Sequence, residues 1–211
     1  MKAFEIIKIG SKFLKENKIP SSILDSEILL SKILNKTREE ILTNLEQTID
    51  KKKVFLFKKY LQRRSKNEPI AYILGEKEFW SSTFHVNNNT LIPRPETELL
   101  VNKLLDIHRN KNISILDIGT GSGCIVVSLL INLKNSIGFG VDISKDAILI
   151  ATKNSIKHKL TNRIKFSTQS FEKIFNKKFD LIVSNPPYIE TKDIKNLSDD
   201  IKKYEPRMAL D

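Results

Sequence analysis

Cysteine and histidine are scarce in this chain of 211 residues, and their scarcity excludes several kinds of site. The single cysteine, Cys124, rules out an internal disulfide and is compatible with the reducing cytoplasm, where we expect the protein to reside. Three histidines, His85, His108 and His158, show no metal-ligand spacing with one another or with Cys124, so no metal site is predicted. We also find no pairing of a nucleophile with a base, and Cys124 is expected to be a small buried residue.

Long apolar runs are also missing. No uncharged apolar stretch approaches the roughly 20 residues that a membrane helix requires, so no membrane association is predicted. The N-terminal residues Met1–Lys8 interrupt their apolar positions with charges, which is typical of an amphipathic helix and not of a signal peptide.

Positive charge, in contrast, is abundant. The chain has 36 Lys+Arg against 25 Asp+Glu, a net charge of +11. Such an excess is expected of proteins with a polyanionic partner. Much of it is lysine accompanied by abundant Asn and Ile, which a biased codon supply would also produce. Charge alone therefore leaves nucleic acid as an alternative partner.

Residues 1–68 are predicted to form a small helical bundle. The first helix ends before Pro20, and the second is capped by Ser22 and is expected to bury Leu24, Ile28, Leu29, Ile33 and Leu34. Thr37 and Glu40 have capping-box spacing at the start of a third helix, and a fourth spans Asp50 to Arg64. The lysines of this fourth helix are interpreted as a solvated face. A bundle of this size is better suited to docking a substrate than to catalysis.

Residues 69–90 are predicted to be a linker that contains a β-hairpin. Apolar residues alternate from Pro69 to Val86 around Gly75, and a turn cluster of three asparagines follows. Pro95 is then expected in the first turn of a helix that continues to about Arg109. Arg94, just before it, is either a surface charge or part of a lid over a bound ligand.

Residues 91–211 are predicted to be an α/β domain. Strands are expected at 113–118, 137–142, 163–167 and 179–183, with helices at 123–133 and 145–158. This alternation predicts a parallel sheet with helices on both faces.

A glycine-rich loop follows the first of these strands. Gly119, Gly121 and Gly123 allow positive φ and a close approach of a ligand, and Asp142 lies 21 residues after Gly121, where a carboxylate can accept both ribose hydroxyls. A dinucleotide fingerprint would place its third glycine where Cys124 stands. Asp117 would repel a pyrophosphate and suits the amino group of S-adenosylmethionine, which we therefore favour over NAD.

The last predicted strand is followed by the sequence Asn-Pro-Pro-Tyr, residues Asn185 to Tyr188. Two successive prolines exclude a continuing helix or central strand, so a rigid loop is predicted at the carboxyl end of the sheet. It offers the Asn185 amide, the carbonyls of Asn185 and Pro186, and the Tyr188 ring. These acceptors and this flat surface suit the holding of a planar nitrogen.

Together, these residues resemble class I S-adenosylmethionine-dependent methyltransferases and, more closely, the release factor glutamine methyltransferase family (HemK/PrmC). The resemblance spans the whole chain in order. It rests on the helical N-terminus, Glu68-Pro69-Ile70-Ala71-Tyr72, Gly75-Glu76-Lys77-Glu78-Phe79-Trp80, Leu91-Ile92-Pro93-Arg94-Pro95-Glu96-Thr97-Glu98, the glycine loop, Asp142 and the Asn185–Tyr188 stretch. It implies a Rossmann-like domain that methylates the side-chain amide of the glutamine in the Gly-Gly-Gln motif of peptide chain release factors.

The resemblance also implies site residues. The cofactor would contact Asp117, Gly119, Thr120, Gly121, Ser122, Gly123, Asp142, Phe171 and Asn185. The target glutamine would meet Asn185, Pro186, Pro187, Tyr188, Arg94 and Thr97, with Asn185, Pro186 and Tyr188 acting in catalysis. Ser170 departs from the family, which commonly has Asp before the aromatic residue beside the adenine.

The family continues with further strands, whereas this sequence stops 23 residues after Tyr188. The resemblance therefore implies four remaining strands, in the order 3-2-1-4. We therefore expect a truncated product with an incomplete sheet, exposed at the edge beside Val183, and a monomer. Two alternatives stay open. One is a methyltransferase acting on exocyclic amines of DNA or RNA, and the other is a non-catalytic remnant of the enzyme.

Overall fold

The computed structural model describes residues 1–174 and 177–211, which form two compact units. The first unit contains residues 1–74 and 198–204, and the second contains residues 75–197 and 205–211. No helix in the described ranges is both long enough and apolar enough to cross a membrane.

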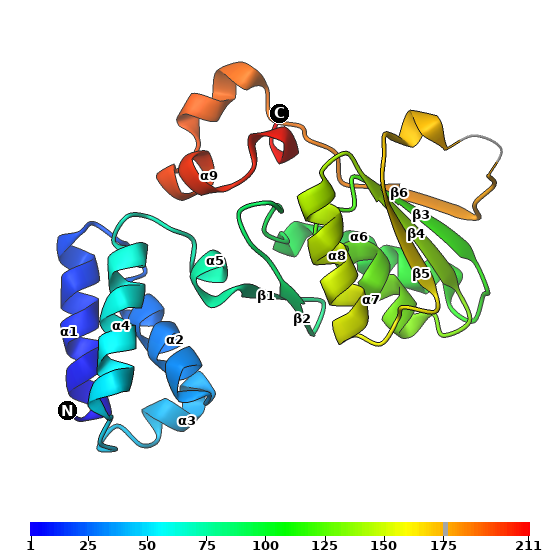
Figure 1. The fold of residues 1–211 in the computed structure, drawn as a ribbon. Helices are drawn as coiled ribbons and strands as arrows, with labels where there is room; N and C mark the ends of the chain where they lie inside the picture. The colour runs from blue at the N-terminus through cyan, green and yellow to red at the C-terminus, as the bar shows by residue number, and fades with distance from the viewer. Residues whose placement is uncertain (175–176) are drawn as a thin grey trace. The chain divides into compact units, whose positions relative to one another are not determined.

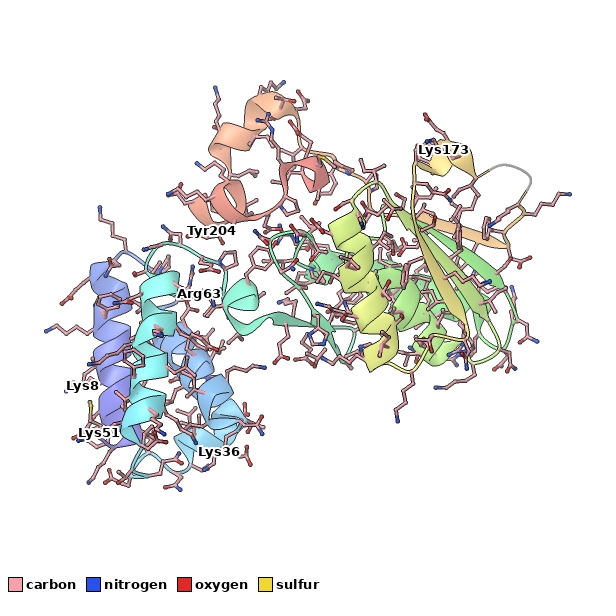
Figure 2. The ribbon with its side chains drawn as sticks, in the orientation of Figure 1. Lys8, Lys36, Lys51, Arg63, Lys173 and Tyr204 are labelled. Carbon is pink, nitrogen blue, oxygen red and sulfur yellow. The ribbon has the colours of Figure 1, made fainter. Side chains whose placement is uncertain are left out.

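The first unit is a helical bundle. It contains α1 (Ala3–Glu16), α2 (Ser22–Leu34), α3 (Arg38–Leu42), α4 (Lys51–Arg64), α5 (Ile70–Leu74) and α9 (Asp199–Tyr204). Helices α1, α2 and α4 pack together (Figure 1). Their apolar side chains, including Leu14, Leu29 and Phe57, form the core. Lys8, Lys36 and Lys51 project from its surface (Figure 2).

Caps account for several helix starts in this unit. The capping box at Thr37 and Glu40 is confirmed, because the Glu40 amide donates to Thr37 Oγ1 and the Thr37 amide donates to Glu40 Oε2. Asp50 caps α4 by accepting from the amides of Lys52 and Lys53. The cap expected at Ser22 was wrong: Ser21 is the capping position, and its side chain makes no capping hydrogen bond. Leu24, expected to be buried, is 44% exposed.

The second unit begins with an antiparallel hairpin of β1 (Glu76–Phe79) and β2 (Ser82–His85). The hairpin is shorter than predicted, because Ile70–Leu74 form α5, where strand alternation was expected. The amides of Tyr72 and Ile73 donate to the Pro69 carbonyl at 3.0 and 3.1 Å, so Pro69 starts a helical turn. A five-residue apolar segment fits either period, and the tertiary context selects the helix.

A parallel sheet forms the centre of the second unit. Its strands are β3 (Ser114–Ile118), β4 (Ile137–Asp142), β5 (Ile164–Thr168) and β6 (Leu181–Ser184), in the order β5-β4-β3-β6. The predicted order is confirmed, and each strand lies within two residues of its predicted bounds. In the described residues, β6 pairs only with β3, as expected for an exposed sheet edge.

Helices α6 (Pro95–His108), α7 (Cys124–Asn132) and α8 (Lys145–Lys157) lie together on one face of this sheet (Figure 1). The expectation of helices on both faces was wrong for the described residues. The β3-α7-β4 and β4-α8-β5 crossovers run the same way along the sheet, so right-handedness places both helices on the same face. Three short helical turns complete the unit: η1 (Phe171–Lys173), η2 (Thr191–Asn196) and η3 (Arg207–Ala209).

Candidate active site

A cavity of about 650 Å³ lies at the carboxyl ends of β3, β4 and β6. This is the edge at which open α/β sheets bind ligands. The loops that follow the strands and the approach to α6 contribute its walls. Eleven of the predicted site residues line it: Arg94, Thr97, Gly119, Thr120, Gly121, Ser122, Asp142, Phe171, Asn185, Pro186 and Pro187.

The glycine loop, residues 119–123, joins β3 to α7. Gly119, Gly121 and Gly123 have φ of +66°, +54° and +78°, a region that L side chains rarely adopt. A Cβ added at Gly119 would meet no atom within 4 Å, so the space above that backbone is open to a ligand. Gly123 is different. It lies outside the cavity wall, and its Cβ would come within 3.2 Å of Ala151 and 3.3 Å of Phe166, so this glycine serves packing.

Asp142 is the last residue of β4, and its carboxylate holds the glycine loop in place. Its Oδ2 accepts from the Gly121 amide at 2.9 Å, and its Oδ1 accepts from the Ser144 amide at 2.9 Å. Each carboxylate oxygen has a second lone pair for a ligand hydroxyl. The side chain is therefore oriented in advance on the cavity wall, which fits the predicted role toward a ribose.

Asp117 lies behind the loop and not on the cavity wall. Its carboxyl group is buried; Thr120 donates to Oδ2 at 2.7 Å, while Oδ1 has no hydrogen-bond partner. Burial raises the pKa of Asp117 to about 7, and the nearby negative charge of Asp142 adds to the increase. A buried acceptor without a hydrogen-bond partner is rare in a folded protein.

Cys124 stands on the wall where α7 begins, but it is not a nucleophile. Burial raises the pKa of its thiol to about 12, so it stays protonated near neutral pH. In residues 1–174 and 177–211, no cluster of His, Cys, Asp or Glu could hold a metal ion.

The segment after β5 forms the far end of the cavity. Gln169, Ser170 and Phe171 line it, and the Phe171 ring is 55% exposed. Ser170 Oγ accepts from the Glu172 amide at 3.3 Å and so caps η1. The hydroxyl at this position thus already supports the turn that presents Phe171.

The Asn185–Tyr188 loop follows β6 at the opposite end of the sheet. Ser184 Oγ donates to the Ile118 carbonyl at 2.9 Å, which ties the end of β6 to the end of β3 beside the glycine loop. Asn185, Pro186 and Pro187 line the cavity, whereas the Tyr188 ring lies outside the wall and is 77% exposed. The loop presents acceptors and no ionisable group to the cavity, so the chemistry it suits is orientation and not proton abstraction.

Arg94 and Thr97 line the cavity from the approach to α6. The Arg94 guanidinium donates to Glu205 Oε1 at 2.7 Å, and the Ile92 amide donates to Glu205 Oε2 at 3.2 Å. The side chain of Glu205 is 1% exposed. Arg94 is therefore not a free surface charge, and its place in a lid over a bound ligand stays a prediction.

Sequence reasoning missed one wall. Pro206, Arg207, Met208 and Ala209 line the cavity although they follow the last predicted strand by more than 20 residues. No local period marks this segment. The only signal was an isolated Glu next to a proline, which does not reveal a partner 111 residues earlier in the chain.

Comparisons with known proteins cover nearly the whole chain. Residues 5–75 match the family described as PrmC N-terminal domain, and residues 95–202 match the family described as methyltransferase small domain. The release factor glutamine methyltransferase of Leptospira interrogans is 42% identical, with 97% of this chain and 73% of that protein covered. The protein of the same name from Buchnera aphidicola is 48% identical, with 88% and 67% covered.

Longer relatives match as well. The bifunctional methyltransferase of Rickettsia typhi is 40% identical, with 93% of this chain covered. The chain spans 42% of the length of that relative.

Proposed function

Because the chain belongs to the release factor glutamine methyltransferase family, we propose that it methylates the side-chain amide nitrogen of the glutamine in the Gly-Gly-Gln motif of peptide chain release factors. S-adenosylmethionine would be the methyl donor. The observation that carries the proposal is the shared cavity, in which the glycine loop and Asp142 face the same space as Asn185 and Pro186.

The residues of the cavity fit this cofactor. The open space above Gly119 accommodates the donor, and Asp142 presents two oriented oxygens for ribose hydroxyls. Asp117, buried behind the loop, would favour a cationic amino group in the cavity through its charge, without lining the wall itself. Phe171 offers an exposed ring at the far end of the cavity for an adenine. When bound, the cofactor supplies an electrophilic methyl group.

The chain's own residues would orient the acceptor amide. An amide nitrogen is a weak nucleophile, because its lone pair is delocalised into the carbonyl. We infer that Asn185 Oδ1 and the Pro186 carbonyl accept the two N–H groups of the target, which favours a pyramidal nitrogen whose lone pair points at the methyl group. Tyr188, exposed at the end of the loop, would pack on the flat amide. Catalysis would come from orientation and fixed dipoles, with no strong base.

The parts of the chain would divide this work. We propose that residues 1–68 dock the release factor, that residues 69–90 are a linker and that residues 91–211 carry the chemistry. A release factor substrate further implies action in the cytoplasm, and we expect the protein to act as a monomer.

Replacing Asn185 with Ala tests the proposal. The variant is expected to lose methyl transfer to a purified release factor by at least about 100-fold, since a fixed acceptor at the reacting group is removed. Binding of S-adenosylhomocysteine, measured by calorimetry, should change little. A release factor with Ala in place of the motif glutamine is the substrate control.

Unchanged transfer by Asn185→Ala would refute the assigned role of Asn185. Methyl transfer by the unaltered chain to DNA or RNA, and not to the release factor, would replace the proposal with the nucleic-acid alternative that the net charge of +11 keeps open.

A further inference from the structure

The wall formed by residues 205–210, which we call the strap, is anchored at both ends. At one end, Glu205 accepts from the Ile92 amide and from Arg94, as described above. At the other end, the Leu210 carbonyl accepts from the Ile189 amide at 3.0 Å, and the Leu210 side chain is buried. Between these anchors, Pro206–Ala209 line the cavity, with η3 closed by the Ala209 amide bonding to the Pro206 carbonyl at 2.9 Å.

The anchors place the strap beside the loop that would hold the target. Ile189 directly follows Tyr188, in the segment after β6. Asp142 and Phe171, by contrast, follow β4 and β5, and the sheet order β5-β4-β3-β6 puts β5 and β6 at opposite edges. The strap therefore borders the end of the cavity near Asn185, away from the end predicted to hold the nucleoside.

The Glu205 contact is too deeply buried to be incidental. A carboxylate whose side chain is 1% exposed requires paired donors, and it receives an uncharged backbone donor and a charged one. If the carboxylate is removed, Arg94 and the Ile92 amide lose their common acceptor, and the start of the strap is no longer fixed to the approach of α6.

From these contacts, the geometry points to Glu205 as a positioning residue for the target side chain, an inference that rests on the proposed function. Glu205 joins Arg94 to the strap, and Pro206–Ala209 then form the wall that confines the glutamine against Asn185. Glu205 and Arg94 act through this wall and not on the reacting atoms. Their loss should therefore harm the use of the release factor and spare the cofactor.

Kinetics of Glu205→Ala and Glu205→Gln test the inference. In the Ala variant, kcat/KM for the release factor is expected to fall on the order of 100-fold, because the target glutamine is no longer confined against Asn185. Gln fills the same volume and keeps an acceptor for one of the two donors, so its loss should be smaller, about tenfold. The affinity for S-adenosylhomocysteine should stay within about twofold, because the nucleoside end is distant. Glu190→Gln is the matched control, since Glu190 pairs with Lys192 nearby but is 68% exposed.

Amide hydrogen exchange provides a readout that needs no methyl transfer. The amides of Ile189, Ala209 and Leu210 are bonded within or to the strap and should be protected in the unaltered chain. Their exchange should accelerate at least about tenfold in Glu205→Ala as the anchor opens, and should not change in Glu190→Gln. Amides of β3 and β4 report whether the variant remains folded.

The outcomes separate the two proposals. An unaltered chain that binds S-adenosylhomocysteine but transfers no methyl group would refute the proposed function, and exchange would still decide whether Glu205 holds the strap. Equal strap exchange in the Ala variant and the unaltered chain would overturn the inference. So would an active chain whose kcat/KM is unaffected by Glu205→Ala, or a variant that loses cofactor affinity as much as it loses kcat/KM.

Discussion

Asp117 is the carboxyl group whose chemistry depends most on its surroundings. Thr120 satisfies one oxygen, the other is buried without a partner, and the pKa is raised to about 7. Because the neutral form is favoured in the folded chain, this residue costs stability once it ionises. A strongly shifted pKa next to a cavity is typical of functional sites, and a cationic group bound in the cavity would favour the ionised form of Asp117.

The raised pKa predicts a pH-dependent stability. The folded-state pKa of about 7 exceeds the usual aspartate pKa of 3.8, so the folded state holds this proton between those two values. The contribution of Asp117 to the free energy of unfolding is thus fully present below about pH 4 and is lost as the pH rises through 7. The slope should be at most about 1.4 kcal/mol per pH unit.

Asp117→Asn should remove this slope. Urea unfolding without ligand between pH 4.5 and 8 measures the effect. The free energy of unfolding of the variant, relative to that of the unaltered chain, should increase as the pH rises. Asp180→Asn is a suitable comparison, because the Ser114 amide and hydroxyl lower the pKa of the exposed Asp180 below its usual value of 3.8. Its contribution is lost only at a more acidic pH, so the stability difference of Asp180→Asn should stay constant between pH 4.5 and 8. A constant difference between Asp117→Asn and the unaltered chain across this range would contradict the assigned pKa.

Among the elements, the hairpin and the glycine loop are joined through one side chain of α8. Asn154 is fully buried; its Oδ1 accepts from the His85 amide at 2.7 Å. Its Nδ2 donates to the His85 carbonyl at 3.0 Å and to the Ser122 carbonyl at 2.8 Å. A single amide thus connects β2, α8 and the loop that lines the cavity, and it fixes the loop from behind.

Asn154→Ala should therefore weaken both the fold and the cofactor site. Leaving the His85 and Ser122 backbone groups unpaired is expected to cost about 2–4 kcal/mol of unfolding free energy. Affinity for S-adenosylhomocysteine, measured by calorimetry where the variant is folded, should fall about tenfold as the loop loses its support. Lys153→Ala, an exposed neighbour on the same helix, should change neither quantity. A variant that lost stability but kept full affinity would show that the loop does not need this support.

Elements with a strong local signal were predicted well from sequence. The strands β3 to β6 stand out as apolar runs, and the Thr37 cap is set by residues three apart. Predictions failed where a distant partner decides the outcome. Ile70–Leu74 alternate like a strand but form α5 after Pro69, and Leu24 is exposed although it lies in an apolar pattern. The strap could not be predicted from local sequence, because its anchors join residues that are 111 and 21 positions apart.

For the whole molecule, the family and the strand order were predicted correctly, and the placement of helices on both faces was not. The order was implied by the family resemblance, which rests on sequence motifs. The shared face of α7 and α8 follows from right-handed crossovers, and α6 lies on that face because it packs on α7. Motifs also identified most of the cavity residues, but they did not distinguish groups on the wall from supports behind it, such as Asp117 and Gly123. Whether a side chain lies on the wall or behind it depends on the folded chain, so a local motif does not reveal it.

Charge is unevenly divided along the chain. Residues 1–74 contain 16 Lys+Arg and 9 Asp+Glu, so about a third of the chain carries +7 of the net +11. On the outer face of α4, Lys52 and Lys59 are exposed, and Lys59 lies 4.7 Å from the centre of the exposed Phe55 ring. This face is basic and partly apolar, which suits the docking of an acidic protein surface.

If residues 1–68 dock the release factor through this face, Lys52→Glu combined with Lys59→Glu should raise the KM for the release factor about tenfold at low ionic strength. The kcat and the affinity for S-adenosylhomocysteine should not change, because neither lysine lines the cavity. Steady-state kinetics between 0.05 and 0.5 M salt give the measurement, and the difference should shrink as salt screens the exposed charges. Lys134→Glu with Lys165→Glu alters the net charge equally at exposed positions of the second unit. An equal rise in KM from both pairs would attribute docking to overall charge and not to α4, and no rise from either pair would remove the electrostatic role of the first unit.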